Sequence, residues 1–418
     1  METYDIAIIG AGAAGLMAAC AAGEKGKAPR VLLLEGQKKP GKRLLATGNG
    51  RCNLSNRHMT PGKYHGDADR IVSLLERFSP NAMEGIFRRM GLFFREEGEG
   101  RLYPYSLQAS SVLSLLLERA NANGVRLLCE KKVSSIRRER SSFQISCGGE
   151  LFTARRLIFA SGGLSYPSLG GSDSGWKLLQ ALGHSLIPAF PSLVQLLTEK
   201  KLVSPLKGVR CRGKVTLLLD AKSAASSQGE IQFTEKGLSG ICVFELSRAY
   251  GEYAQKGGKA GELSCDLMPE YSVKDISLYL RERIRCSSLP AEELLDGLLP
   301  KQMGRGILKR SLVTMNCVCG DLGGRDIAAI ARQIKDIRFP ITGTAGWEAA
   351  QVTAGGIPLR EVNLQTMESR RCPGVYLAGE LLNIDGDCGG YNLHWAWSTG
   401  YLAGISAAAE WRQEYGCI

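Results

Sequence analysis

The stretch YDIAIIGAGAAGLMAAC, residues 4–20, decides the fold. Its first part, Tyr4 to Ile9, is an apolar run rich in β-branched side chains, which predicts a buried strand. Gly10, Gly12 and Gly15 follow at GxGxxG spacing, and an alanine-rich helix comes next. Such glycines permit, in order, a tight turn, close approach of the backbone to a pyrophosphate, and close packing of helix on sheet. The stretch predicts a Rossmann-type unit with phosphate bound at the helix N-terminus.

The second strand of this unit, Val31 to Leu34, ends at an acidic residue, Glu35, which Gly36 follows. A carboxylate at this place can accept hydrogen bonds from a ribose diol, which favours FAD or NAD over NADP. The helix amides of Ala13 and Ala14 are the expected phosphate ligands. No second GxGxxG follows a strand in the sequence, so we expect one tightly bound dinucleotide. A second dinucleotide would have to dock without a Rossmann domain of its own.

Two later segments also end a strand in glycines. The strand Leu157 to Ala160 runs into three small residues where backbone can approach a ligand, namely Ser161, Gly162 and Gly163. The strand Val375 to Ala378 precedes a glycine-rich loop and an alanine- and aromatic-rich helix. A loop that feeds a helix N-terminus indicates a negatively polarised ligand group. Its candidate residues are Gly379, Glu380, Asp385, Gly389, Gly390, Tyr391, Asn392 and Leu393.

The middle of the chain has a different character. From about residue 191, three segments predict strands: KVTLLLD, GEIQFTEKG and ELSCDLMP. Two more, SVKDISLYLRERIR and AEELLDGLLPKQMGRGILKRSL, predict helices. We therefore expect residues 191–340 to be an inserted domain, and residues 1–190 and 341–418 to fold together as one discontinuous dinucleotide-binding domain.

Composition sets further limits. The chain has 418 residues and a net charge of +12, but its basic residues come in scattered pairs such as Arg137-Arg138 and Arg155-Arg156. This dispersal favours anionic cofactors or substrates over nucleic acid. No window reaches the ~18 apolar residues of a membrane span, and the N-terminus shows no signal peptide. We expect a cytoplasmic protein with its thirteen cysteines reduced. Four histidines and a lone Cys317-x-Cys319 pair predict no metal site.

Four segments together resemble one family. They are DIAIIGAGAAGLMAA (5–19), ATGNGRCNLSN (46–56), FASGGLSYPSLGGSDSGWKLLQALGHSL (159–186) and the stretch 350–404, which contains GDCGGYNL. These segments resemble the HI0933-like, or bile-acid-reductase-like, NAD(P)/FAD-dependent oxidoreductases, which include aminoacetone oxidases. The resemblance implies an α/β fold: a discontinuous Rossmann-like FAD-binding domain with an inserted β-barrel-like domain and a helical subdomain.

The resemblance also implies roles for residues. The loop 46–56 would run from the adenosine towards the flavin ring, with Gly50 and Cys52 against the cofactor. Arg51 and Asn53 would donate hydrogen bonds to flavin or to a bound anion, as catalytic candidates or as braces of the loop, and Cys52 would be an inert buried thiol. Val133 would read adenine through its backbone, Glu380 and Asp385 would lie near the ribityl chain and pyrophosphate, and residues 390–393 would present helix amides to the flavin.

His394 stands where the resemblance leads us to expect glutamine. It is a candidate proton donor or a buried structural histidine.

The sequence is compatible with three functions. The leading hypothesis is an FAD-dependent oxidoreductase that uses NAD(P)H to reduce a C=C bond conjugated to a ketone, on a 3-oxo-4,6-diene bile-acid type of substrate. The second is a flavin amine oxidase of the aminoacetone type that uses O2. The third, from another class, is an FAD-dependent RNA-modifying protein, motivated by the net charge of +12.

Overall fold

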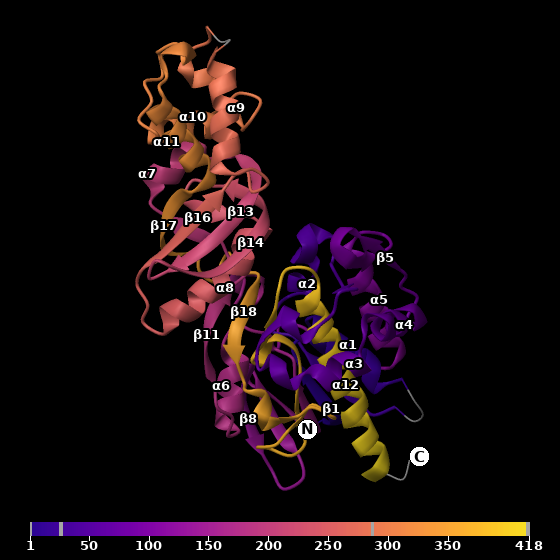
Figure 1. Cartoon of the computed structure of the whole chain (residues 1–418). Coiled ribbons are helices and arrows are strands. Elements are labelled where there is room, and N and C mark those ends of the chain that lie inside the picture. Colours follow the sequence, from indigo (N-terminus) through magenta and orange to yellow (C-terminus); the bar gives the residue numbers. More distant parts are fainter. Residues whose placement is uncertain (1, 25–27, 286–287, 415–418) are drawn as a thin grey trace. The chain divides into compact units, whose positions relative to one another are not determined.

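The structure is a computed structural model that describes residues 2–24, 28–285 and 288–414 (Figure 1). The chain divides into two compact units. The first combines the described residues of 1–189 and 352–418, and the second is Phe190–Gln351. Strand β11 (Ile187–Ser192) carries the chain out of the first unit and β18 (Val352–Gly356) brings it back.

A nine-stranded sheet organises the first unit. Its main path runs β19-β20-β21-β10-β1-β2-β7, and β1 is parallel to β10 and to β2, as a Rossmann unit requires. A hairpin of β8 and β9 extends β10 on the side. The strands are β1 (Thr3–Ile9), β2 (Val31–Leu34), β7 (Arg126–Leu128), β8 (Val133–Arg138), β9 (Phe143–Cys147), β10 (Glu150–Phe159), β19 (Val362–Asn363), β20 (Glu368–Ser369) and β21 (Val375–Leu377).

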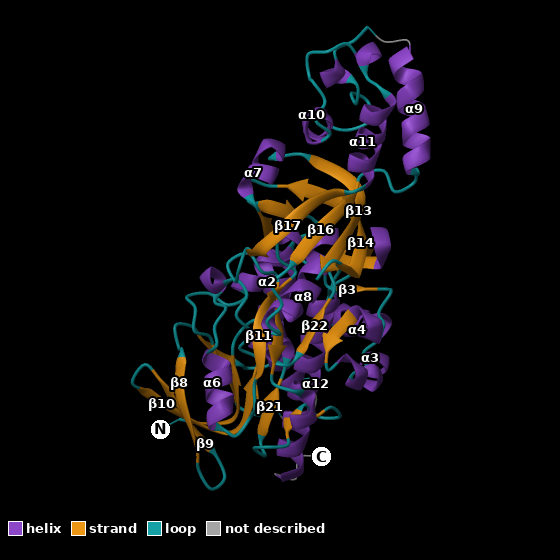
Figure 2. Cartoon of the chain, turned by 60° about the vertical axis from the view of Figure 1, so that its left-hand side comes forward, coloured by secondary structure: helices purple, strands orange, loops and turns teal. Residues whose placement is uncertain are grey.

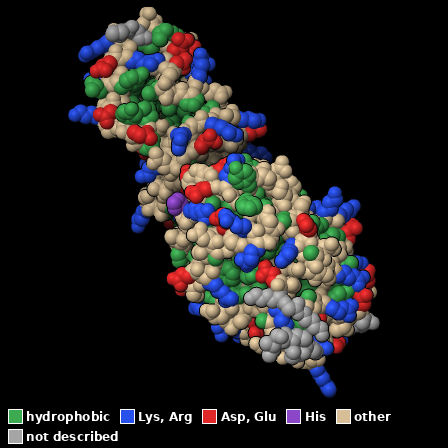
Figure 3. All heavy atoms as spheres, turned by 90° about the vertical axis from the view of Figure 1, so that its right-hand side faces the viewer, with side chains coloured by type: hydrophobic (Ala, Val, Ile, Leu, Met, Phe, Trp, Pro, Cys, Tyr) green, Lys and Arg blue, Asp and Glu red, His purple; other side chains and the backbone are tan. Residues whose placement is uncertain are grey.

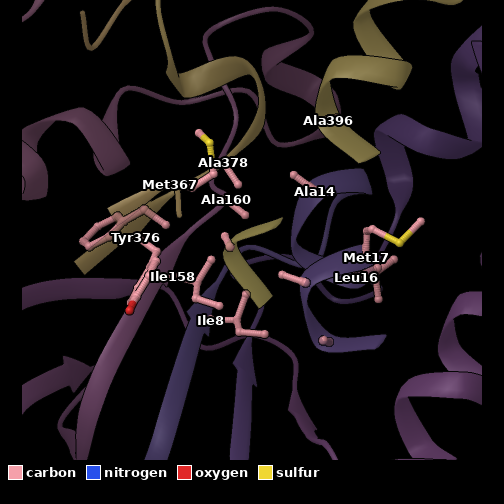
Figure 4. Close-up of a cluster of buried hydrophobic side chains, with 14 of the residues drawn as sticks. Ile8, Ala14, Leu16, Met17, Ile158, Ala160, Met367, Tyr376, Ala378 and Ala396 are labelled. Atoms are coloured by element: carbon pink, nitrogen blue, oxygen red, sulfur yellow. The ribbon is translucent and has the colours of Figure 1, made fainter. Parts of the chain in front are cut away.

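The core of this unit lies where helices cover the central strands. Ile8 pairs with Ile158, which in turn pairs with Tyr376, so three strands far apart in sequence share one buried layer. Figure 4 shows these side chains beside Leu16 and Met17 of helix α1 (Ala13–Ala22). All five are at most 1% exposed, which accounts for the apolar run that opens the sequence.

Helix α12 (Tyr391–Glu414) packs directly on α1. A Cβ on Gly400 would come within 2.3 Å of the Ala14 carbonyl oxygen, and one on Gly404 within 2.4 Å of that of Ala18. The two backbones approach this closely only because both positions are glycine. The remaining α-helices of the unit are α2 (Lys42–Ala46), α3 (Val72–Arg77), α4 (Pro80–Arg89), α5 (Ala109–Ala122) and α6 (Ser174–Ala181).

Two small sheets stand beside the loop 46–56. One has the order β3-β6-β5, with β3 (Ser55–Asn56), β6 (Arg101–Pro104) and β5 (Phe94–Glu97). The other pairs β22 (Ile384–Gly386) with β4 (Tyr64–Gly66). The second of these sheets connects residues 64–66 with the C-terminal glycine-rich segment.

The second unit contains a closed barrel in the order β12-β15-β14-β13-β16-β17. Phe233 and Phe339 are fully buried in its core with ring centroids 5.6 Å apart. Inward positions alternate with exposed ones, as in β17, which is the pattern of a filled barrel. The strands are β12 (Leu196–Thr198), β13 (Arg210–Leu219), β14 (Lys222–Phe233), β15 (Gly237–Ser239), β16 (Gly261–Asp266) and β17 (Ile337–Thr344).

Helices complete the second unit, and α9, α10 and α11 lie together beyond one end of the barrel strands (Figure 2). They are α7 (Lys200–Val203), α8 (Ile241–Gln255), α9 (Val273–Arg285), α10 (Lys301–Arg310) and α11 (Gly324–Lys335). The predicted α/β fold class is thus confirmed: a Rossmann-type unit with an inserted barrel and a helical subdomain.

Two details of the sequence reading were wrong. The stretch 291–312 is not one helix: a short 3-10 turn at Ala291–Glu293 precedes α10, which begins only after Pro300. A proline ring clashes inside a helix but is tolerated at its start. Strand Leu157–Ala160 is also not separate, because β10 runs unbroken from Glu150 to Phe159.

The second domain boundary also shifts. A boundary at 340/341 would cut β17, where Thr198 and Ile341 pair between β12 and β17 and help to close the barrel. The compact units therefore divide at 351/352. That each unit folds as a body of its own remains a prediction.

On the face drawn in Figure 3, Lys and Arg side chains are interspersed with Asp and Glu. No helix among the described residues has the length and apolar character to cross a bilayer.

Candidate functional site

The N-terminus of α1 has open space in front of it. A Cβ on Gly15 would lie 1.8 Å from the carbonyl oxygen of Gly10, so the helix sits tightly against the turn. A Cβ on Gly12 would meet no described atom within 4 Å. Within the described residues, the first turn of α1 has no acidic side chain and no side-chain cap. Its first amides, including those of Ala13 and Ala14, are placed to accept an anionic group.

Glu35 braces the glycine-rich turn. One carboxylate oxygen accepts the amide of Ala11 at 2.8 Å and the other accepts the amide of Gln37 at 2.8 Å. The carbonyl of Glu35 accepts the amide of Lys131 at 2.8 Å, which draws the segment before Val133 towards this strand end. The predicted adenosine residues Glu35, Gly36 and Val133 therefore lie in one neighbourhood, since Gly36 faces Lys132 at 3.6 Å from its Cβ position.

A partly buried ion pair joins helix α2 to the turn after β21. Arg43 Nη1 lies 2.6 Å from Glu380 Oε2, and their side chains are 27% and 17% exposed. The amide of Gly163 donates to the same oxygen at 3.1 Å, and the amide of Thr353 donates to Oε1 at 2.9 Å. The Ser165 hydroxyl donates to Oε1 at 3.0 Å and accepts from Arg43 Nη2 at 2.8 Å.

This network keeps both partners charged. Burial alone would raise the pKa of Glu380, but Arg43 and the hydrogen bonds outweigh burial and lower that pKa below its ordinary value. Burial alone would likewise lower the pKa of Arg43, and Glu380 raises it instead. With four donors on its two oxygens, Glu380 acts as an anchor for the surrounding turns.

The loop 46–56 contains residues with left-handed backbone conformations. Gly48 and Gly50 have φ of 56° and 83°, and Asn49 and Cys52 have φ of 54° and 60°. A non-glycine residue in this region costs on the order of 1–3 kcal/mol, and such strain concentrates at functional sites. The contacts of the surrounding structure therefore have to offset the energetic cost of this backbone conformation.

Arg51 turns towards the hairpin β5–β6. Its guanidinium pairs with Glu97 and lies over the Tyr103 ring at 4.5 Å, with 40% of the side chain exposed. These contacts correspond to the bracing role among the two roles expected for Arg51. Cys52, in contrast, is fully buried, and burial raises the pKa of its thiol to about 12. A protonated buried thiol has no nucleophilic character at neutral pH.

The start of α12 lies on this loop. A Cβ on Gly390 would come within 2.4 Å of the Ser55 carbonyl oxygen and 2.7 Å of Asn53 Oδ1. Trp397 Nε1 donates to the carbonyl of Leu54 at 3.1 Å. The two most specific segments of the sequence, GNGRCN and GDCGGYNL, are thus brought together by packing.

Asn392 closes the turn before the helix. Its side-chain amide bonds both the N–H and the carbonyl of Gly386 at 2.8 Å. Tyr391 is buried and its carbonyl accepts the Tyr64 hydroxyl at 3.0 Å, while Leu393 is partly buried against the core. The side chains of Tyr391, Asn392 and Leu393 therefore hold the loop, which leaves backbone groups as the means of contact with a ligand.

His394 is enclosed and electrically neutral. Its Nε2 donates to the Phe78 carbonyl at 2.7 Å, so its Nδ1 accepts from the Ser55 hydroxyl at 2.8 Å. Burial lowers its pKa to about 4. These surroundings oppose the proton-donor role considered for His394, because a neutral ring with both nitrogens occupied has no proton to release at neutral pH. The structural role fits instead.

Two aspartates of this segment differ in their surroundings. Asp385, a predicted site residue, is 1% exposed and lies in β22 opposite His65 of β4. Asp387 is bound by His65 at 2.9 Å and by Lys63 at 3.3 Å. Among the described residues, no group of three His, Cys, Asp or Glu side chains could hold a metal.

Two buried polar atoms test whether a dinucleotide fits. Asn53 Oδ1 and Ser161 Oγ are shielded from solvent and have no hydrogen-bond partner among the described residues. Such groups are costly when unsatisfied. Asn53 Oδ1 lies beside the α12 N-terminus, 2.7 Å from the Cβ position of Gly390, whereas Ser161 Oγ faces α6, 1.9 Å from the Cβ position of Gly175. Together with the open space at Gly12, the Asn53 oxygen fits a bound FAD.

The chain matches the family described as the HI0933-like protein Rossmann domain over residues 4–406. The chain belongs to the HI0933-like family. A relative in Clostridium scindens, named 3-dehydro-bile acid delta(4,6)-reductase, is 39% identical over 407 residues, which cover 96% of this chain and 98% of that protein. A relative in Escherichia coli, named ribosomal RNA dihydrouridine synthase, is 31% identical over 405 residues, which cover 96% and 97%.

Solved structures place the HI0933-like chain in the FAD oxidoreductase fold. The crystal structure of 3-ketosteroid-delta4-(5alpha)-dehydrogenase from Rhodococcus jostii RHA1 matches with a TM-score of 0.52 at 15% identity, covering 97% of each chain. At this identity the likeness establishes the fold, and the chemistry has to be argued from the site.

Sequence reasoning missed three residues of the HI0933-like site: Arg43, Ser165 and Thr353. All three lie on or next to segments that carry the family resemblance, but none is a glycine or a strand-terminal acid. Their common signal is that each bonds to another of the three or to Glu380, and that pairing is visible only in three dimensions.

Proposed function

We propose that this protein is an FAD-dependent reductase that adds hydrogen across a C=C bond conjugated to a carbonyl, with NADH or NADPH as electron donor. The observation that carries the proposal is the junction of Gly390 with Ser55 and Asn53, which sets the N-terminus of α12 against the loop 46–56. Bound FAD, once reduced, supplies hydride to such a substrate.

The residues of the chain would hold the two ends of the cofactor. The α1 amides and Glu35 suit the pyrophosphate and the adenosine ribose. The α12 N-terminus suits a group that gains negative charge during reduction, because the helix dipole is positive there. At the same place Asn53 Oδ1 is an unsatisfied acceptor, which suits an N–H group of a ligand.

Relatives support the choice of reaction. The Clostridium scindens protein is named as a reductase of a 3-dehydro-bile acid at delta(4,6). A 3-oxo-4,6-diene is a C=C system conjugated to a ketone, so we take a steroid of this type as the lead substrate. The nicotinamide donor would dock transiently, since the sequence contains one GxGxxG strand–helix unit.

A second candidate has its own observation. Two relatives are named ribosomal RNA dihydrouridine synthase. Dihydrouridine forms by reduction of the uracil C=C bond conjugated to a ring carbonyl, which is the same reaction class on an RNA substrate. On the face drawn in Figure 3, basic and acidic side chains are mixed, and the basic residues of the sequence come in scattered pairs, so we rank this candidate below the steroid.

Product analysis separates the candidates. The purified protein with NADH and a 3-oxo-4,6-diene steroid should yield a steroid that has gained two hydrogens per reduced bond, measured by mass spectrometry. A parallel incubation with unmodified ribosomal RNA should give no dihydrouridine. Dihydrouridine without steroid reduction would replace the lead with the second candidate, and peroxide formed from an amine would indicate an oxidase.

A further inference from the structure

We propose that Arg43 is the cationic ligand of the FAD pyrophosphate, and that Glu380 and Ser165 hold its guanidinium in place for that purpose. The inference rests on the proposed function only in taking FAD as the cofactor, and it is tested without turnover.

Arg43 stands where the turns of the dinucleotide site meet. It is the second residue of α2, and Gly41, the residue before this helix, donates its amide to the Ala11 carbonyl of the glycine-rich turn at 2.9 Å. Its Nη1 is 3.0 Å from the Cβ position of Gly162, in the turn that ends β10. Arg43 is thus tied to the glycine-rich turn through Gly41 and borders the turn 161–163 directly.

The third turn at this place carries its partner. Gly379 lies next to α1, with its Cβ position 3.0 Å from the Ala14 Cβ, and Glu380 follows. The guanidinium therefore lies in the region where Rossmann folds bind the diphosphate.

The guanidinium is oriented but not saturated. Arginine carries five N–H donors in a fixed plane. Among the described contacts, Nη1 uses one on Glu380 and Nη2 uses one on Ser165. The side chain remains 27% exposed, so further donors can reach a ligand. A planar fork of this kind matches phosphate oxygens two at a time.

The local charges call for such a cation. A pyrophosphate is anionic, and the partly buried Glu380 would repel it if the charge of the carboxylate were not balanced. The neighbouring Lys42 points elsewhere, with its Nζ bonded to the Gln37 side chain at 3.0 Å, whereas the ion pair of Glu380 is with Arg43. Arg43 therefore neutralises the charge of the Glu380 carboxylate and also directs N–H donors towards the phosphates.

The test compares two probes on the full-length apoprotein by calorimetric titration. ADP carries the diphosphate and adenosine does not. Arg43→Met should lower the affinity for ADP and FAD about tenfold or more, and should leave adenosine affinity unchanged. Lys42→Met is the matched control, one residue away with the same charge removed, and should change ADP affinity by less than about threefold.

Three outcomes would overturn the proposal. An Arg43→Met variant that binds ADP as the parent does would remove Arg43 from the phosphates. An equal loss of ADP affinity in Lys42→Met would show that the effect comes from the overall positive charge of this segment and not from the position of Arg43. Full recovery of ADP binding in Arg43→Met/Glu380→Gln would show that Arg43 only compensates the carboxylate.

A measurement on the unaltered chain covers the case in which Arg43→Met does not fold. Arginine-selective modification with phenylglyoxal, mapped by mass spectrometry, should label Arg43 in the apoprotein. ADP should protect Arg43 from the reagent and adenosine should not. Labelling of Arg43 that persists at saturating ADP would contradict the proposal.

Discussion

Gly390 lies so close to Ser55 that a Cβ would stand 2.4 Å from the Ser55 carbonyl oxygen. This contact joins the loop after the second strand to the first turn of the last helix, across most of the chain. Both segments contain left-handed backbone at this contact, since Gly390 has φ of 98° and Cys52 has φ of 60°.

Replacing Gly390 should therefore damage the site. Gly390→Ala meets both a backbone clash and a left-handed φ, so we expect a loss of about 3 kcal/mol or more in the free energy of unfolding, with poor FAD retention. Gly183→Ala is the control, because Gly183 has φ of 93° but its Cβ position has no described atom within 4 Å. Urea unfolding should show the control losing about 1–2 kcal/mol, and equal losses would contradict the contact.

Glu35→Ala should weaken FAD binding. The substitution removes the acceptor for the ribose diol and for the amides of Ala11 and Gln37, at a cost of about 1–3 kcal/mol. We expect the dissociation constant of FAD to rise about tenfold or more, measured by fluorescence titration of the apoprotein. Glu35→Gln retains one acceptor and should lose less. Unchanged affinity in Glu35→Ala would mean that the ribose lies elsewhere.

Substitution of Arg51 tests whether its guanidinium takes part in catalysis or only braces the loop 46–56. If it stabilises charge near the flavin, Arg51→Ala should keep FAD and lose on the order of 100-fold in turnover. Glu97→Gln is the matched variant, because it breaks the Arg51 ion pair and leaves the guanidinium in place. We predict a larger loss for Arg51→Ala. Equal, small losses in flavin occupancy and rate would assign Arg51 to bracing alone.

Cys52→Ser should keep both FAD and turnover. The thiol is protonated at neutral pH because burial raises its pKa to about 12. Steady-state rates across pH 6 to 9 should therefore have the same profile in parent and variant. A variant that holds FAD but does not turn over would make Cys52 the group that faces the substrate.

His394 should make stability sensitive to acid. Burial lowers its folded pKa to about 4 from an ordinary 6.5, so the folded state binds its proton less readily than the unfolded state. The stabilisation is complete above pH 6.5 and is lost as the pH falls towards 4, by about 3 kcal/mol in all. His394→Gln should remove this part of the pH dependence in urea unfolding at pH 5 and 7.5. An unchanged dependence would contradict the burial argument.

The sequence predicted the parts of the fold that follow from local pattern. The first βαβ unit was predictable because strand, glycines, helix and Glu35 occur in order. The first half of β14, with the sequence KSAASSQ, was not, because it is polar and largely exposed and is held by pairing with β13. The ion pair of Arg43 with Glu380 joins residues 337 positions apart, and no periodic pattern in the sequence predicts such a contact.

Anaerobic stopped-flow spectroscopy tests most directly whether this protein is an FAD-dependent reductase of conjugated C=C bonds. The flavin absorbance of the purified protein should bleach rapidly on mixing with NADH or NADPH. It should then recover when a 3-oxo-4,6-diene steroid is added without oxygen. A flavin that neither nucleotide bleaches, or that stays reduced in the presence of the steroid and recovers only with O2, would contradict the account.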